Sequence, residues 1–195
     1  MYPYNHKLGQ IIQSDVDGVS CDRSFLAHFS VAAASAIAAS DTAVHAAITL
    51  AAEAADITTN ITNPAVPRAL RIKGNAASVT GDVVITGTNY KGEAITETIA
   101  SNGASAVEGN KAFKTVTKIT VPALAAEGDT ISVGFNEKLG LPYLLTHNTV
   151  LKTYLDNALE GTAPTVTVSA TAIESNTIDL NSALSGKIVD IYLIV

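Results

Sequence analysis

The sequence has a single cysteine, no tryptophan and few other aromatic residues, and each shortage narrows the range of functions. Cys21 has no second cysteine with which to form an intramolecular disulfide or a Cys-x-x-Cys metal or redox site. Cys21 lies beside Asp22 and Arg23, and we interpret it as a small, partly buried residue rather than a nucleophile. With aromatics at only 5% of the chain, the core is built from Ala, Val, Ile and Leu, which bury less area per side chain. We therefore expect stability to come from β-pairing and from contacts with other subunits.

Charged residues make up 15% of the chain, below the roughly 25% of typical globular domains. A surface so poor in charge is either covered by partners or made of Thr, Ser and Asn, and both interpretations stay open. The net charge is −6 and the Lys and Arg residues are scattered singly. Nucleic-acid binding needs clustered cations to neutralise phosphates, so we do not expect it.

The chain also has no long apolar run. Residues 1–7 contain no apolar h-region, so we expect no secretory signal peptide. The most apolar window, residues 29–55, is interrupted by Ser35, Asp41 and Glu53 and is too polar for a membrane span. These features predict a protein that is made in a cytoplasm, is not exported by a standard route and does not enter a membrane.

Residues 1–42 are predicted to form an extended N-terminal arm that includes an alanine-rich segment. Proline and glycine interrupt any helical period in the first 28 residues. Residues 31–39 are rich in alanine, the best helix former, and favour a short helix, with coil over 29–42 as the alternative. From residue 43 threonine becomes frequent, and we expect strands over 43–50 and 56–61. A single long helix over 30–55 is the alternative.

Residues 68–135 carry the clearest β pattern, in which short alternating runs are separated by glycine and asparagine turns. Strands are expected over 83–88 and 94–99, joined by a hairpin turn at 89–92. A further strand over 111–121 has a slip in its alternation, which suggests a bulge or a change of face. Another strand is expected over 131–135.

The C-terminal part is expected to hold a loop over 139–142, a strand from Val150 to Asp156-Asn157, and short strands over 165–169 and 177–180. The chain ends on a very apolar strand, 188–195. An unpaired edge of that composition would aggregate, so we expect this strand to be central in a sheet or paired with another subunit.

The fold class predicted from these elements is mainly β, a β-sandwich or small barrel with the extended N-terminal arm and the short alanine-rich helix. The β-rich domain is expected over 43–195, with a subdivision near 140–148.

The side chains that could take part in catalysis or metal binding form no recognisable catalytic or metal motif. The four histidines have no spacing typical of metal sites: His6, His28, His45 and His147. The Asp15-Val16-Asp17-Gly18 run matches part of a calcium loop, but the later ligands do not follow. We therefore predict no catalytic, cofactor-binding or metal-binding residues.

Two further patterns are given structural interpretations. Glu93 and Glu97 are four residues apart on one expected strand, near the separation that glycosidase carboxylates need. Tyr90 is the one aromatic residue near them, so we interpret them as exposed strand glutamates. The Asn60-Ile61-Thr62 sequon carries little weight without an export signal.

Three motifs carry a family resemblance: 63–68 (NPAVPR), 86–93 (TGTNYKGE) and 138–143 (KLGLPY). At these motifs the chain resembles small structural proteins of tailed bacteriophages and prophages, over roughly residues 43–195. Within that group it looks most like the head decoration, or capsid cement, proteins. The resemblance implies a non-enzymatic oligomer on the capsid surface that bridges neighbouring major capsid proteins after assembly in the host cytoplasm.

Three other functions remain open. A tail-tube, head–tail connector or head-fibre subunit would also suit an apolar final strand that can pair between subunits. A glycan-binding β-sandwich module would need aromatic platforms, and this chain has few aromatics. An enzyme is the least favoured, because no set of residues in the sequence forms a catalytic motif.

Overall fold

Strands account for nearly all of the regular structure in the residues described by the computed structural model, which are 12–13, 20–21 and 25–195. The strands are, in chain order, β1 Ile12–Gln13, β2 Ser20–Cys21, β3 Leu26–Val31, β4 Ser40–Thr49, β5 Ala55–Ile57, β6 Arg68–Gly74, β7 Asp82–Thr88, β8 Ala94–Ala100, β9 Val107–Phe113, β10 Thr115–Val121, β11 Thr130–Gly140, β12 Val150–Leu155, β13 Ala158–Leu159, β14 Thr165–Thr167, β15 Thr177–Asp179 and β16 Val189–Ile194. A single 3₁₀ turn, η1 (Ile173–Ser175), is the only helical element of these ranges. Nothing helical in the described part of the chain is both long enough and apolar enough to cross a membrane.

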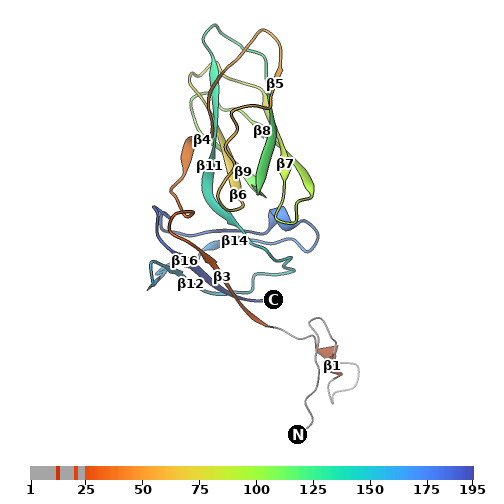
Figure 1. The fold of residues 1–195 in the computed structure, drawn as a ribbon, viewed down its shortest axis with the longest axis vertical. Helices are drawn as coiled ribbons and strands as arrows, with labels where there is room; N and C mark the ends of the chain where they lie inside the picture. Colours follow the sequence, from red (N-terminus) through yellow and green to blue (C-terminus); the bar gives the residue numbers. More distant parts are fainter. Residues whose placement is uncertain (1–11, 14–19, 22–24) are drawn as a thin grey trace.

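The strands form three larger antiparallel sheets, which curl into a two-tier body (Figure 1). The upper tier contains the sheet β5-β10-β7-β8 and most of the sheet β14-β15-β11-β6-β9, in which β4 also pairs with β11. The lower tier contains the sheet β13-β12-β16-β3, together with β14 and β15. The fold is therefore mainly β with a sandwich-like, half-barrel architecture, as the sequence predicts.

Each tier has its own hydrophobic core. The upper core gathers buried side chains from the two facing sheets: Val44, Ile48, Leu50, Leu70, Ile72, Val79, Val83, Ile85, Ile95, Ile99, Phe113, Val116, Ile119, Val121, Ile131, Val133 and Phe135. The lower core has buried aliphatic side chains, with Phe29 and Tyr143 packed against them: Val31, Ala36, Leu139, Leu141, Leu145, Leu155, Ile178, Leu180, Leu184, Val189, Ile191 and Leu193. Strand β11 joins the tiers, since Ile131 packs in the upper core and Leu139 in the lower one.

Arg68 is buried at the waist between the tiers, with 1% of its surface exposed. Strand β11 is irregular between Phe135 and Leu139, where its register with β6 shifts. The Arg68 guanidinium donates to the Asn136 carbonyl through Nε (2.9 Å) and Nη2, and to the Ile37 carbonyl through Nη1 (2.9 Å). It also lies 4.2 Å from the ring centroid of Phe135. Burial lowers the pKa of Arg68 to about 10, so the side chain stays cationic at neutral pH.

Several strands expected from the sequence are confirmed. Strands β7 and β8 pair in continuous register around the predicted turn at 89–92. The expected strand over 111–121 is in fact two strands, because the chain leaves β9 in one sheet and enters β10 in the other at Lys114. The final strand β16 is central in its sheet, between β12 and β3, as its apolar composition predicts.

The predicted alanine-rich helix is wrong, and so is the alternative of a long helix over 30–55. Residues 26–31 form strand β3, and β4 begins at Ser40. Between them is a single turn, in which the Ala32 carbonyl accepts the N–H groups of Ser35 and Ala36. Pairing of β3 with β16 and burial of Val31 and Ala36 in the lower core override the helix propensity of alanine, which is a weak preference. The expected loop at 139–142 likewise begins inside β11.

Glu97 of β8 ties the edge of one upper sheet to β9 in the other. Its Oε1 atom accepts the backbone N–H groups of Asn110 (2.6 Å) and Lys111 (3.2 Å). Gly109 leaves the space for this carboxylate, because a Cβ there would lie 2.5 Å from Glu97 Oε2. Burial raises the pKa of Glu97, although these hydrogen bonds oppose the rise.

We expect Glu97→Gln to leave the free energy of unfolding at pH 7 unchanged or to raise it by up to about 1 kcal/mol. A carboxyl group whose pKa is higher in the folded than in the unfolded state contributes its full stabilisation below the unfolded pKa of 4.5. That stabilisation is lost as the pH rises through the folded pKa. Glutamine keeps an acceptor oxygen without the charge, so this fall should be smaller. Thermal melts across the acidic to neutral range check this, with Glu93→Gln in the exposed hairpin as the control. A Glu97→Gln variant with the wild-type pH dependence would contradict the assignment.

Candidate interaction surface

The lower tier presents one face of the sheet β13-β12-β16-β3 away from its core. Along β16, Val189, Ile191 and Leu193 are buried in the lower core, while Asp190 and Tyr192 alternate with them. Asp190 and Tyr192 therefore point to the opposite side of the sheet. We call this side the outer face and define it by Leu26 and His28 of β3, Lys152 and Tyr154 of β12, and Asp190 and Tyr192 of β16.

Three rings pack together at the centre of the outer face. His28 stacks on Tyr192, with ring centroids 4.6 Å apart and an interplanar angle of 6°. Tyr154 meets Tyr192 edge-on, at a centroid separation of 5.9 Å and an angle of 85°. The register explains the contacts, because Tyr192 lies opposite His28 on one side and next to the β12 strand on the other. The packed rings form a preorganised aromatic patch.

Asp190 holds the histidine in place. His28 Nε2 lies 2.8 Å from Asp190 Oδ1. Hydrogen bonds from the Ser30 hydroxyl and from His28 hold the pKa of Asp190 below its usual value, with burial opposing them in part. This side chain is therefore ionised at neutral pH and orients the His28 ring against Tyr192.

Large aliphatic side chains are exposed around the rings. Leu26 is 64% exposed, Leu151 53% and Leu159 51%. Leu26 and Leu151 line a shallow hollow of about 280 Å³ with Lys152, Tyr154 and Tyr192. Exposed leucines beside tyrosines, with Lys152 as the one charged residue of the hollow, are typical of a protein interface rather than of a surface that faces water.

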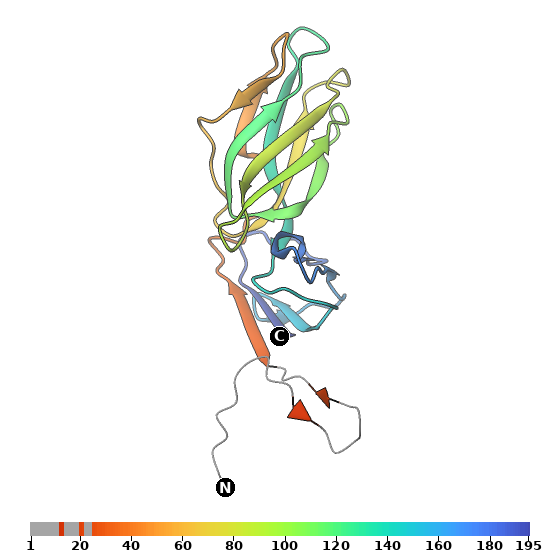
Figure 2. The same cartoon turned by 90° about the vertical axis from the view of Figure 1, so that its right-hand side faces the viewer.

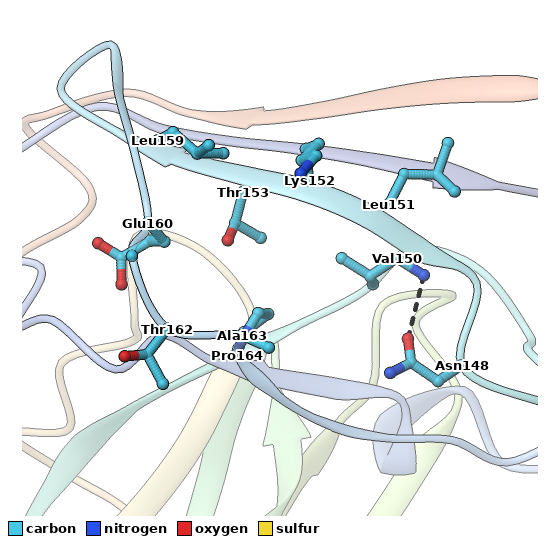
Figure 3. A pocket seen from close by; sticks show the side chains of 11 residues that line it. Asn148, Val150, Leu151, Lys152, Thr153, Leu159, Glu160, Thr162, Ala163 and Pro164 are labelled. Atoms are coloured by element: carbon cyan, nitrogen blue, oxygen red, sulfur yellow. Dashed lines mark hydrogen bonds between the residues drawn. The ribbon is translucent and has the colours of Figure 1, made fainter.

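A groove of about 270 Å³ with a mixed polar and apolar lining lies between β12 and residues 160–164 (Figure 3). Thr153 points into it, and Glu160 and Thr162 line it from the facing segment. The Glu160 carboxylate accepts a hydrogen bond from the N–H of Ser182 (3.2 Å). This bond connects two loops, so the carboxylate already has a structural partner. The groove has room for a small molecule. Within the described part of the chain, its lining brings no nucleophile and general base together, so the groove is better suited to binding a ligand than to catalysing a reaction.

One carboxyl group with a raised pKa lines a second hollow of similar size. Burial, and then the nearby charge of Glu108, raise the pKa of Asp179, while Lys138 opposes them. Asp179 shares the hollow with Thr165 and Asn181. A shifted pKa in a concave site is typical of functional residues, yet general acid–base chemistry also needs a reacting group within hydrogen-bond reach. Asp179 is the only titratable side chain in the lining of this hollow as described.

The structure separates the residues that the sequence singles out. His28 is on β3, His45 is on β4 and His147 follows β11 in a loop. Cys21 belongs to β2, whereas His6 and the Asp15–Gly18 run lie outside the described residues. Over residues 12–13, 20–21 and 25–195, no three His, Cys, Asp or Glu side chains are grouped as metal ligands would be.

The two expected strand glutamates have different roles. Glu93 is exposed in the β7–β8 hairpin and accepts from Asn89 Nδ2 at 2.8 Å. The same Asn89 nitrogen also donates to Glu174 of η1 at 3.2 Å, which links the hairpin to the lower tier. Glu97 binds β9 instead, so the prediction of an exposed side chain is correct for Glu93 and wrong for Glu97. In Asn60-Ile61-Thr62, Asn60 is exposed with φ of 56°.

Sequence reasoning did not identify the outer face. The sequence contains part of the pattern that marks this face. Asp190 and Tyr192 interrupt the apolar run 188–195 at alternate positions, which indicates a strand with one side more polar than the other. The pairing of β3 with β16, however, joins residues 162 positions apart, as in the His28–Asp190 contact. No local pattern specifies that pairing.

Comparison of the chain with models of protein families, with curated proteins and with solved structures found no match.

Proposed function

We propose that this chain is a non-enzymatic structural protein of a tailed-phage virion, which decorates the capsid and stabilises it by bridging major capsid proteins. The observation that carries the proposal is the outer face, where the exposed Leu26 and the partly exposed Tyr154 and Tyr192 line one hollow. The resemblance of the 63–68, 86–93 and 138–143 motifs to decoration proteins supplies the class of partner.

The outer face has the composition of an interface centre. Tyrosine supplies a large contact area at a low cost in side-chain entropy, and clustered aromatic anchors often dominate binding energy. The rings are already packed against one another, and Asp190 holds the His28 ring, so little ordering is needed on binding.

The two tiers suit a bridging subunit. Figure 2 shows the upper tier rising away from the lower tier, with β3 along the outer side of the latter. Residues 1–24 join the body at Phe25, which pairs with Val195 next to the outer face.

Capsid binding tests the proposal. Wild-type protein should co-sediment with shells assembled from the major capsid protein of the same phage, and Tyr192→Ala should weaken binding by about tenfold or more. Tyr90→Ala, in the upper-tier hairpin, is the matched control and should bind like wild type. No binding by the wild-type protein would overturn decoration, and equal binding by Tyr192→Ala would overturn the role of the outer face.

A glycan-binding module is the second candidate, because a shallow hollow of about 200 Å³ brings Tyr154, Asn157, Asp190 and Tyr192 together. Aromatic faces beside carboxylate and amide groups can bind a sugar ring and its hydroxyls. A glycan array with hits that Tyr192→Ala abolishes would favour this function. An array without hits would remove it.

A further inference from the structure

Strand β3 is one of the two edge strands of the lower sheet, and it has a regular ladder on its β16 side. It pairs with β16 through six consecutive residue pairs, from Leu26–Ile194 to Val31–Val189, without a bulge. Just before the strand, Phe25 and Val195 exchange two backbone hydrogen bonds of 2.8 and 2.9 Å.

This pair fixes which backbone groups of β3 face away from β16. In an antiparallel ladder, hydrogen-bonded and non-hydrogen-bonded pairs alternate. Phe25 and Val195 form a hydrogen-bonded pair. The N–H and C=O groups of Ala27, Phe29 and Val31 therefore also point at β16. The N–H and C=O groups of Leu26, His28 and Ser30 therefore point to the open edge, and within the described ranges no backbone partner meets them.

The comparable edge of the upper tier is protected. At the edge of β8, Lys111 Nζ donates to the Thr96 carbonyl at 2.8 Å, and Glu97 connects the strand to β9. Lysine and inward-pointing charges are common devices that prevent edge-to-edge pairing. Strand β3 contains no proline, lysine or glutamate, and its first residue, Leu26, is largely exposed.

We propose that β3 pairs with β3 of a second copy of this chain, antiparallel, about a two-fold axis at His28. Residues that oppose each other must point to the same face, so Leu26, His28 and Ser30 can oppose only one another. The register centred on His28 pairs Leu26 with Ser30 of the partner subunit, His28 with its own copy, and Ser30 with Leu26 of the partner subunit. If one strand slides by two residues along the other in either direction, only two such residue pairs form instead of three.

The side chains agree with this register. On the inner side of the sheet, Phe29 opposes Ala27 of the partner subunit, so a large side chain meets a small one twice. Phe29 is only partly buried in the single chain, and the pairing would cover it. The two four-stranded sheets become one eight-stranded sheet, and their outer faces become one continuous surface. The dimer goes beyond the proposed function and does not depend on it.

Sedimentation equilibrium on paired variants tests the dimer. Ser30→Pro removes an N–H group that β16 does not use, at an edge position where proline is tolerated. Ser30→Ala loses the same hydroxyl but keeps the N–H, so it is the matched control. Wild type and Ser30→Ala should have twice the 20.1 kDa subunit mass, and Ser30→Pro should raise the dimer dissociation constant by about 100-fold or more.

Amide hydrogen exchange on the wild-type protein gives an independent result that needs no variant. In the dimer, the amides of Leu26, His28 and Ser30 should be protected, and their protection should fall on dilution. The amides of Phe29 and Val31 should stay protected at all concentrations, because β16 holds them. A monomer at every concentration, or a dimer with rapidly exchanging His28 and Ser30 amides, would overturn the proposal.

Discussion

Arg68→Met is expected to lower the free energy of unfolding by about 3–5 kcal/mol. The Arg68 guanidinium satisfies the carbonyls of Asn136 and Ile37 at the waist and lies over the Phe135 ring. Methionine fills similar volume but donates no hydrogen bond, which leaves buried carbonyls unpaired at about 1–3 kcal/mol each. Chemical denaturation followed by circular dichroism measures the loss.

Arg71→Met is the matched control for this prediction. Arg71 is on the same strand and forms an ion pair with Asp41 (2.9 Å), but both side chains are partly exposed. Such pairs contribute about 0–1 kcal/mol, so the control should lose far less stability. Equal losses in the two variants would show that the waist does not depend on the buried guanidinium.

Asn176→Ala is expected to destabilise the protein by about 3–5 kcal/mol. Asn176 is fully buried in the lower tier. Its Oδ1 accepts the N–H groups of Leu145 (3.1 Å) and Ser169 (2.9 Å), and its Nδ2 donates to the carbonyls of Ser169 (2.8 Å) and Ala172 (2.9 Å). Alanine removes all four bonds at once and leaves the buried Leu145 N–H and the partly buried backbone groups of Ser169 and Ala172 without this partner.

Asn181→Ala, at an exposed site five residues away, should leave stability within about 0.5 kcal/mol of wild type. Thermal melts of both variants check the contrast. Because Asn176 organises loops that support the lower sheet, its loss should also weaken protection of the β16 amides. A folded Asn176→Ala variant with wild-type stability would contradict the role of this side chain.

The upper tier was largely predictable from the sequence. Strands β7 and β8 alternate apolar and polar residues around a turn that contains Gly92, whose φ is +84°. Local pattern and turn chemistry point to the same hairpin there. Likewise, the apolar composition of 188–195 predicted a strand that is central in a sheet or paired with another subunit, and β16 is central in its sheet.

The lower tier and its surface were not predictable in the same way. Alanine favours a helix near residues 31–39, but pairing with β16 and burial of Val31 decide the conformation. The aromatic patch arises only after His28 and Tyr192 become neighbours, and the waist needs Arg68 beside Asn136. Such long-range pairings depend on the whole fold and leave little trace in any short segment.

Buried polar groups hold the two tiers in one arrangement, and the lower tier presents the outer face and the open edge of β3. A rigid body that displays a preformed surface loses little entropy when it binds a lattice.

The proposal that this chain decorates a tailed-phage capsid is tested most directly by a cryo-EM map of phage particles produced by the source of the chain. The proposal predicts density for the two-tier body on the outside of the capsid, with the outer face of the lower tier in contact with major capsid proteins. Density at the tail or neck would contradict decoration and favour a tube, connector or fibre subunit. Particles without such density would contradict a structural role in the virion.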